Sequence, residues 1–211
     1  NQSGVGAAAA GATPPINGIQ DAIDAEITTS LELGHKTTFM AGRLQLNTAL
    51  FITEVKNAPY FVFVGAVGAQ VLVPLENVRL RGGELEAVAQ LAPGLDAYAG
   101  LGITSSRIQS YTVNPGAVGN KAPYIPDASA NIGAQYRFAL SQGLRMAVRA
   151  DVVYKGKQYW DPENSLARNA QTLLNLRASV EDSKGQWSSS LSVNNATDKA
   201  YNAEWVAGGF A

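Results

Sequence analysis

Two glutamates form the sequence's clearest pair of neighbouring carboxylates. Glu84 and Glu86 are two positions apart, so both side chains would point to the same face of a β-strand. Carboxylates held close together can act as general acid and general base. We favour the more ordinary interpretation, in which the pair belongs to a polar wall that faces water.

Further charged residues fall at polar positions of later segments. Neighbouring strands of a sheet lie about 4.8 Å apart, so Arg149, Asp151 and Arg177 could form a charge ladder from strand to strand. Such a ladder would fasten a barrel wall or line a channel, and we favour the structural role. The full set of candidate wall residues is Glu84, Glu86, Arg145, Arg149, Asp151, Arg177 and Glu181.

One stretch of polar and aromatic residues suggests a ligand-binding loop. The run Asp161-Pro162-Glu163-Asn164 could bind a cation, although such runs more often form turns with exposed carboxylates. Tyr159 and Trp160 precede it. Exposed aromatic rings there could contact a ligand or anchor the loop at a membrane interface.

The composition excludes several classes of protein. There is no cysteine and a single histidine, His35, so neither a thiolate nor a multi-histidine metal site can form, and we expect no enzyme and no cofactor. A net charge of −1 argues against a nucleic-acid partner. Charged residues make up 16% of the chain, below the quarter or so of a typical soluble domain.

Apolar and polar residues alternate with a period of two along most of the chain. Leu144, Met146 and Val148, for example, are separated by Arg145 and Ala147. Successive side chains of a strand point to opposite faces, so the pattern predicts strands with one apolar and one polar face. We expect eight strands, at residues 24–38, 44–64, 70–91, 95–108, 127–139, 144–156, 171–182 and 187–196.

The connections between these segments alternate in length. We expect short turns at residues 40–43, 92–94, 140–143 and 183–186, and long connections near 64–70, 109–126 and 157–170 and after 196. Short turns at one end and long loops at the other are typical of outer-membrane barrels. The spacing therefore predicts consecutive hairpins in up-and-down order.

A transmembrane barrel fits the strands better than a soluble sandwich, although both would alternate. The apolar faces carry almost no charge, and the strands reach or exceed the roughly 9–11 residues that a tilted membrane strand needs. Phe39, Phe138, Tyr154 and Trp187 lie near strand ends, where an interfacial girdle would place them. We expect the apolar faces on the outer, convex side.

The two ends of the chain differ in composition from its middle. Residues 1–23 are rich in Gly and Ala and predict a flexible loop, residues 24–196 carry the strand pattern, and residues 197–211 predict a loop leading to a missing final strand. The chain does not begin with methionine and has no signal peptide pattern. We therefore expect it to be part of a longer protein.

Five short motifs follow one another along the chain. They are Glu26-x-x-x-Ser30-x-Glu32-x-Gly34-x-Lys36, Gly42-Arg43-Leu44-x-Leu46-Asn47-x-Ala49-x-Phe51, Gly83-x-Leu85-Glu86, Leu174-Asn175-Leu176-Arg177-Ala178 and Asn195-Ala196-Thr197-Asp198-Lys199-x-Tyr201. In this order they resemble the C-terminal part of the barrel of TonB-dependent outer-membrane receptors. The third departs from the family pattern, because its first glutamate, Glu84, directly follows the glycine.

The resemblance implies a role in active transport across the bacterial outer membrane. It implies uptake of a scarce nutrient, most often a ferric siderophore, through a barrel of about 22 strands. This chain would supply part of the wall and of the outer loops, in contact with outer-membrane lipid. The implied partners are a small ligand such as a metal chelate and the TonB complex, which acts through a plug domain absent from this chain.

Two other functions remain open on the sequence. One is a passive porin or a small structural barrel, closed by pairing of the strand near Glu26 with the strand near Leu191. The other is a soluble β-sandwich binding module. We expect instead a curved, open sheet whose edge strands lack partners, because the resemblance places further strands between the two edges.

Overall fold

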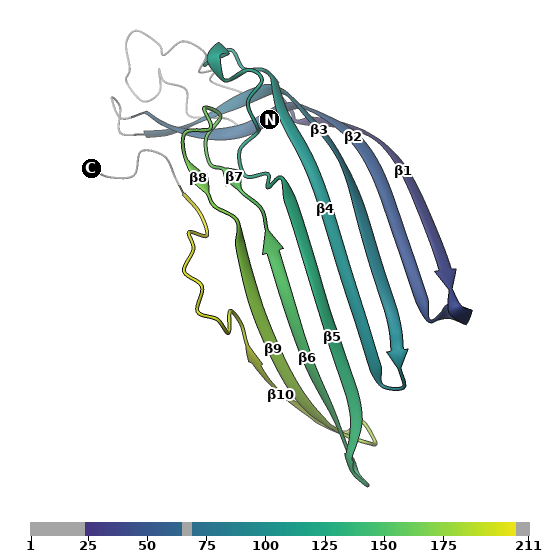
Figure 1. Cartoon of the computed structure of the whole chain (residues 1–211). Helices are drawn as coiled ribbons and strands as arrows, with labels where there is room; N and C mark the ends of the chain where they lie inside the picture. The colour runs from purple at the N-terminus through teal and green to yellow at the C-terminus, as the bar shows by residue number, and fades with distance from the viewer. Residues whose placement is uncertain (1–23, 65–68, 206–211) are drawn as a thin grey trace.

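The regular structure of the chain is almost entirely β-strand. The computed structural model describes residues 24–64 and 69–205. Eight strands form one antiparallel sheet, which Figure 1 shows as a row of neighbouring strands. They are β1 (Ile27–Phe39), β2 (Leu44–Val64), β3 (Ala69–Ala92), β4 (Leu95–Ser110), β5 (Ala128–Ser141), β6 (Leu144–Lys155), β9 (Gln171–Asp182) and β10 (Ser188–Val193).

The order of the strands confirms the predicted up-and-down arrangement. Each strand pairs with its neighbour in the chain, except that the short strands β7 (Gln158–Tyr159) and β8 (Ala167–Arg168) form a separate pair between β6 and β9. The 3-10 turn η1 (Met40–Gly42) joins β1 to β2. Pro93 and Gly94 join β3 to β4, and Gly94 is needed there because its φ is +79° and a Cβ would collide with the carbonyl oxygen of Arg137.

One face of the sheet is apolar across its whole width. Residues directly opposite each other on antiparallel strands point to the same face, so the register defines rows that cross the sheet. One such row contains an apolar residue from every strand. It consists of Phe39, Leu44, Ala89, Ala97, Ala134, Ala150, Leu176 and Val193.

The apolar face is open to its surroundings. Leu31, Leu33 and Leu191 are 72–75% exposed. Tyr136 and Phe138 stack on each other near the short turns of this face, with their ring centroids 5.4 Å apart. A water-soluble domain rarely leaves so wide an apolar surface uncovered, whereas a membrane wall requires one.

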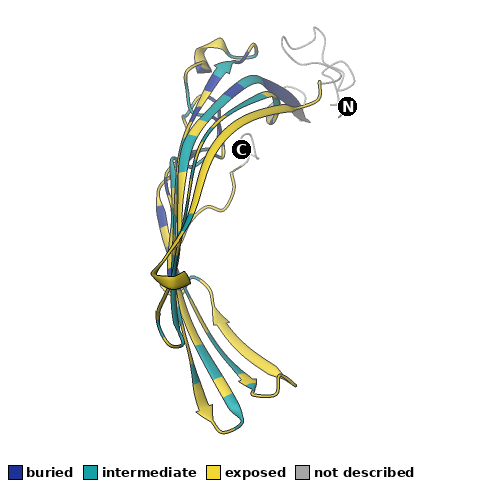
Figure 2. Ribbon diagram, turned by 90° about the vertical axis from the view of Figure 1, so that its right-hand side faces the viewer, coloured by how far each residue is buried: buried dark blue, intermediate teal, exposed yellow. Residues whose placement is uncertain are grey.

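The sheet is a single open layer. In the described residues β1 pairs with β2 alone and β10 pairs with β9 alone, and the only strands outside this sheet are the two-residue pair β7 and β8. Figure 2 shows the layer in profile as a long curve. The structure thus agrees with the expected open sheet and differs from both a closed ring of eight strands and a two-sheet sandwich.

The hairpin of β2 and β3 agrees with the two strands predicted at residues 44–64 and 70–91. They pair as far as Val64 and Ala69, and residues 65–68 of the expected connection lie outside the described part of the chain. The hairpin bends where Asn57 adopts a φ of +56° and where the pairing of β3 with β4 shifts register between Asn77 and Val78. Pro59 and Pro74 lie opposite each other beyond this bend, within the paired part of the hairpin.

The remaining boundaries differ little from those predicted. The predicted loop at residues 1–23 and the last residues, 206–211, lie outside the described part of the chain. Residues 197–205 contain no strand. Within the described ranges, no helix has the length and apolar character needed to cross a membrane.

A matched pair of substitutions in β6 tests which face meets lipid. Val152 lies on the apolar face opposite Ile132 and Leu174, and Val153 lies on the polar face opposite Asn131. We expect Val152→Arg in the complete gene product to lower the free energy of unfolding in lipid vesicles by about 2–4 kcal/mol. Val153→Arg should change it little, and equal losses for the two variants would contradict the assignment of the faces.

Candidate functional site

The polar face of the sheet lines a wide hollow. The hollow has a volume of about 1080 Å³ and reaches from Tyr98 on β4 to Ser192 on β10. Four arginines and two carboxylates line it, so it is cationic on balance. They are Arg137, Arg145, Arg149, Arg177, Asp151 and Glu181.

A compact polar network lies at the centre of this wall. Arg149 donates hydrogen bonds from Nε and Nη2 to the two carboxylate oxygens of Asp151, at 2.8 and 2.9 Å. The Tyr98 hydroxyl donates to the same carboxylate, and the guanidinium of Arg149 lies 4.7 Å from the centre of the Tyr98 ring. The ring crosses the backbone of Gly133, where a Cβ would collide with it. Asp151 is thus held from two sides.

The charge ladder expected among Arg149, Asp151 and Arg177 does not run from strand to strand. Arg149 pairs with Asp151 within β6, whereas Arg177 lies directly opposite Arg149 and donates to Ser190 Oγ at 3.3 Å. An ion pair between β6 and β9 lies nearer the short turns, where Arg145 Nε is 3.2 Å from Glu181 Oε1. All these pairs are at least partly exposed, so each contributes little to stability. Their consequence is a hydrated, charged wall.

The glutamate pair lies on the same face but in another part of the wall. The register carries the row of Glu86 through Gly100 on β4 to Asn131 on β5, which lines the hollow. Both glutamates are exposed, and Glu86 accepts a hydrogen bond from Asn47 Nδ2 at 3.3 Å. The register therefore gathers all seven candidate wall residues on one face.

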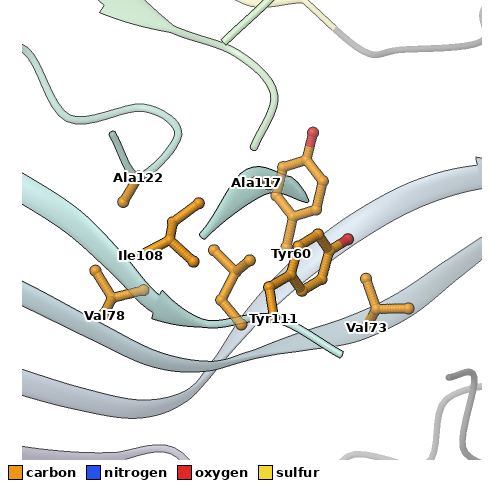
Figure 3. Close-up of a cluster of buried hydrophobic side chains, with 8 residues drawn as sticks. Tyr60, Val73, Val78, Ile108, Tyr111, Ala117 and Ala122 are labelled. Carbon is orange, nitrogen blue, oxygen red and sulfur yellow. The ribbon is translucent and has the colours of Figure 1, made fainter. Parts of the chain in front are cut away.

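Above the wall, the long loops cover the polar face with an apolar cluster. Figure 3 shows side chains from β2, β3, β4 and the β4–β5 connection packed together, including a 3-10 turn, η2 (Pro115–Ala117). The connection runs back along β4, because Gly119 donates to the carbonyl of Ile108 at 2.9 Å. The buried members are Tyr60, Val73, Leu75, Val78, Ile108, Tyr111, Ala117 and Ala122.

Backbone and amide hydrogen bonds join two of the long loops. Asn164 accepts from the Lys121 backbone N–H at 3.0 Å and donates to its carbonyl at 2.9 Å. Asn120 Nδ2 donates to the carbonyl of Pro162 at 3.0 Å. The Tyr60 hydroxyl donates to the carbonyl of Trp160 at 3.0 Å, so the β2–β3 hairpin also contacts this group of loops.

Two expectations for the β6–β9 loop need correction. Asp161 is 5% exposed rather than solvated, and its carboxylate accepts from the N–H groups of Ser165 and Leu166 and from the Ser165 hydroxyl. Trp160 is 4% exposed, so its ring belongs to the packing of the loops, while Tyr159 is half-buried beside Lys157. Glu163 remains exposed, as expected of a turn.

Burial in the loop cluster keeps two tyrosine hydroxyls protonated. Burial first, and then the neighbouring Tyr124, Asp161 and Glu163, raise the pKa of Tyr60 far above its ordinary value. Burial and the carboxylates of Glu163 and Glu76 raise the pKa of Tyr111 to about 12. The neutral hydroxyls therefore stabilise the cluster fully below about pH 10, and this contribution is lost as the pH rises through the folded-state pKa values.

Sequence reasoning missed several residues of the site. Asp96 and Arg137 form an ion pair between β4 and β5, and Tyr98 supports Asp151. The alternation that selected the other wall residues also places these three on the polar face. In residues 24–64 and 69–205, no group of three or more His, Cys, Asp or Glu side chains could hold a metal ion.

The family model that describes the β-barrel of TonB-dependent receptors matches residues 2–196. The chain belongs to the TonB-dependent receptor family. Receptors of this family function in transport, and their barrels lie in the bacterial outer membrane, which is therefore the location of this receptor chain. The resemblance seen in the five motifs is confirmed.

Known relatives show which proteins this receptor chain is similar to. It is 35% identical over 145 residues to the ferrioxamine receptor of Yersinia enterocolitica, a match that covers 65% of this chain and 19% of that protein. The ferric yersiniabactin uptake receptor FyuA of Yersinia pestis matches 87% of the chain and 27% of its own length, with a TM-score of 0.70 and 21% identity. The ferric preacinetobactin receptor BauA of Acinetobacter baumannii matches 82% of the chain and 26% of its own length, with a TM-score of 0.65 and 22% identity.

The chain thus spans about a fifth of the curated relative and about a quarter of the solved receptors. The identities to the solved receptors are low, so these matches establish the fold alone. Together with the open sheet, they confirm that the chain is one arc of a larger antiparallel barrel.

The hydrogen bonds of Asp161 give a testable role in the outer loops. We expect Asp161→Ala to release the turn at Ser165 and Leu166, at a local cost of about 1.5–3 kcal/mol for the lost bonds to a charged acceptor. Hydrogen exchange of residues 158–168 in the complete gene product should accelerate by at least about tenfold. Glu163→Gln removes the charge of an exposed carboxylate in the same loop and keeps an oxygen that can accept from Asn114 Nδ2, so it serves as the control, and equal acceleration in both variants would contradict this role.

Proposed function

We propose that this chain forms part of the wall and outer loops of a transporter that takes up a ferric siderophore across the outer membrane. The observation that carries the proposal is the 35% identity over 145 residues to a ferrioxamine receptor. The names of the fold relatives FyuA and BauA describe ferric siderophore receptors as well, although their low identity supports no more than the fold.

The two faces of the sheet suit this role. The apolar face would contact outer-membrane lipid, and the charged face would line a water-filled lumen, as the alternation of membrane barrels requires. The candidate lumen residues are the seven wall residues that the strand pairing places on one face, from Glu84 on β3 to Glu181 on β9. In outer-membrane barrels the long loops face the outside of the cell, so the loop cluster would border the ligand's path into the lumen.

Transport against a gradient needs a source of energy. We propose the TonB complex as the partner that supplies it, acting through a plug domain inside the complete barrel. The wall described here would then be the fixed frame against which such a plug moves. The continuous antiparallel pairing supports a rigid frame, because backbone hydrogen bonds join each of the eight strands to its neighbour.

Copper transport is a second candidate function. The copper transporter OprC matches 86% of the chain with a TM-score of 0.64 and 19% identity. The fold is therefore shared by receptors for different cargoes. The identity to the ferrioxamine receptor is the observation that favours the iron chelate.

Uptake of labelled metal separates these functions. Cells that lack their own siderophore receptors and express the complete gene product should take up iron from ferrioxamine, and uptake should stop when TonB is deleted or the proton gradient is collapsed. Cells without the gene are the control. Uptake that persists without TonB would indicate a passive channel, and uptake of copper without iron would favour the second candidate.

A further inference from the structure

A group of charged residues lies on the same side of the sheet as the apolar face. The register pairs Glu54 of β2 with Arg79 of β3, and Arg79 with Arg107 of β4, so the three side chains share one face. Lys56 and Arg81 lie two positions from Glu54 and Arg79 along the same strands, so they share that face too. We call this group the exterior patch, and it consists of Glu54, Lys56, Arg79, Arg81 and Arg107.

The exterior patch begins where the apolar surface of these three strands ends. Its row of Glu54, Arg79 and Arg107 lies ten positions along the strands from the apolar row that contains Leu44, an even number that keeps the two rows on one face. At the positions of β2, β3 and β4 that face outwards between the patch and the short turns, all within the described ranges, there is no Asp, Glu, Lys or Arg.

The length of this apolar stretch places the patch at the membrane surface. Ten positions measure about 34 Å along a strand, or about 26 Å of bilayer height at a strand tilt of about 40°, and the apolar band of a membrane barrel is about 25 Å tall. The patch lies at the end of the strands that carries the long loops, which face the outside of the cell. It therefore lies at the level of the lipid headgroups of the outer leaflet.

The exterior patch carries positive charge that the described residues do not neutralise. Arg79 donates from Nε to Glu54 Oε1 at 2.9 Å. Lys56, Arg81 and Arg107 are exposed and form no ion pair within residues 24–64 and 69–205. Four cations and one carboxylate give the patch a net charge of +3.

Like charges are crowded at the centre of the patch. Arg79 and Arg107 lie directly opposite each other, and Arg81 follows Arg79 by two positions on the same face. Like charges directly opposite each other destabilise a sheet, and the one carboxylate of the patch is already bound by Arg79. An anion between the guanidinium groups would offset this repulsion. Phosphate suits them, because a guanidinium can donate two parallel hydrogen bonds to its oxygens.

We propose that the exterior patch binds the phosphate groups of an anionic lipid in the outer leaflet. Arg81 and Arg107 donate to the phosphate oxygens, while Arg79 and Lys56 add charge. The acyl chains of the same lipid lie along the apolar rows nearer the short turns, where Ile103 is 57% exposed. A lipid held in this way fixes the height of the barrel in the membrane. This partner is separate from the transported cargo, so the inference goes beyond the proposed uptake function.

Three probes test the patch on the complete gene product, purified in a nonionic detergent. They are a glycolipid with two phosphate groups (lipid A), the same lipid after removal of both phosphates, and inorganic phosphate. Native mass spectrometry counts the bound lipid molecules and measures their affinity. We expect the phosphorylated lipid to bind at least about tenfold more tightly than the dephosphorylated lipid, as expected for charge-assisted hydrogen bonds. An excess of inorganic phosphate should not displace it, because the acyl chains contribute to binding.

Matched double variants show which arginines hold the lipid. Arg81→Gln combined with Arg107→Gln should lower the affinity for the phosphorylated lipid at least about tenfold and leave the affinity for the dephosphorylated lipid unchanged. The corresponding double substitution to Lys should retain more affinity, because the charge remains. Arg145→Gln combined with Arg177→Gln removes the same charge from the polar face, and this control should bind the phosphorylated lipid as the native receptor does.

Three results would overturn the proposal. Equal affinities of the native receptor for the two lipids would show that the acyl chains alone hold the lipid. Displacement of the lipid by inorganic phosphate would show that the patch is a site for a soluble ion. Equal losses in the two double Gln variants would show a general effect of charge. None of these results bears on the cargo, which the uptake of labelled metal tests separately.

Discussion

Backbone hydrogen bonding in the absence of water is the constraint on which this structure depends. In hydrocarbon every unpaired N–H and C=O group costs several kcal/mol, so strands can cross a membrane only within a closed barrel. Within the described residues, β1 and β10 each leave one edge unpaired. The apolar face nevertheless extends across all eight strands to both edges, as the row from Phe39 to Val193 shows. Other strands must therefore pair with these edges in the membrane.

The same register that builds the apolar face creates the functional face. Because side chains alternate, each lipid-facing residue such as Ala150 is flanked by lumen-facing ones such as Arg149 and Asp151. The wall is thus charged without any charge meeting lipid in its central rows. At the outer end the alternation no longer determines the structure. There the bent β2–β3 hairpin and the two long loops bury Tyr60, Ile108 and Trp160.

Prediction from the sequence succeeded for the strands, because the alternation of apolar and polar residues is local and has a period of two. All eight strands lie within a few residues of the predicted ranges, and all seven candidate wall residues share one face, because a period of two fixes both properties. It failed in the loops, where burial depends on segments distant in sequence. The ring of the buried Trp160 lies against that of Tyr124, 36 residues earlier, and the turn that Asp161 organises buries its carboxylate.

The central claim is that this chain is an arc of a larger barrel. Disulfide cross-linking between β1 and β10 tests it most directly. This chain has no cysteine of its own. Ser30 and Thr53 lie opposite each other on β1 and β2 with their hydroxyl oxygens 2.8 Å apart, so cysteines at this pair should form a disulfide in the complete gene product. Cysteine at Ser190, combined in turn with cysteine at each position from 28 to 36, should form none. Efficient cross-linking of any of these β1–β10 pairs would show a closed eight-stranded ring and contradict the account.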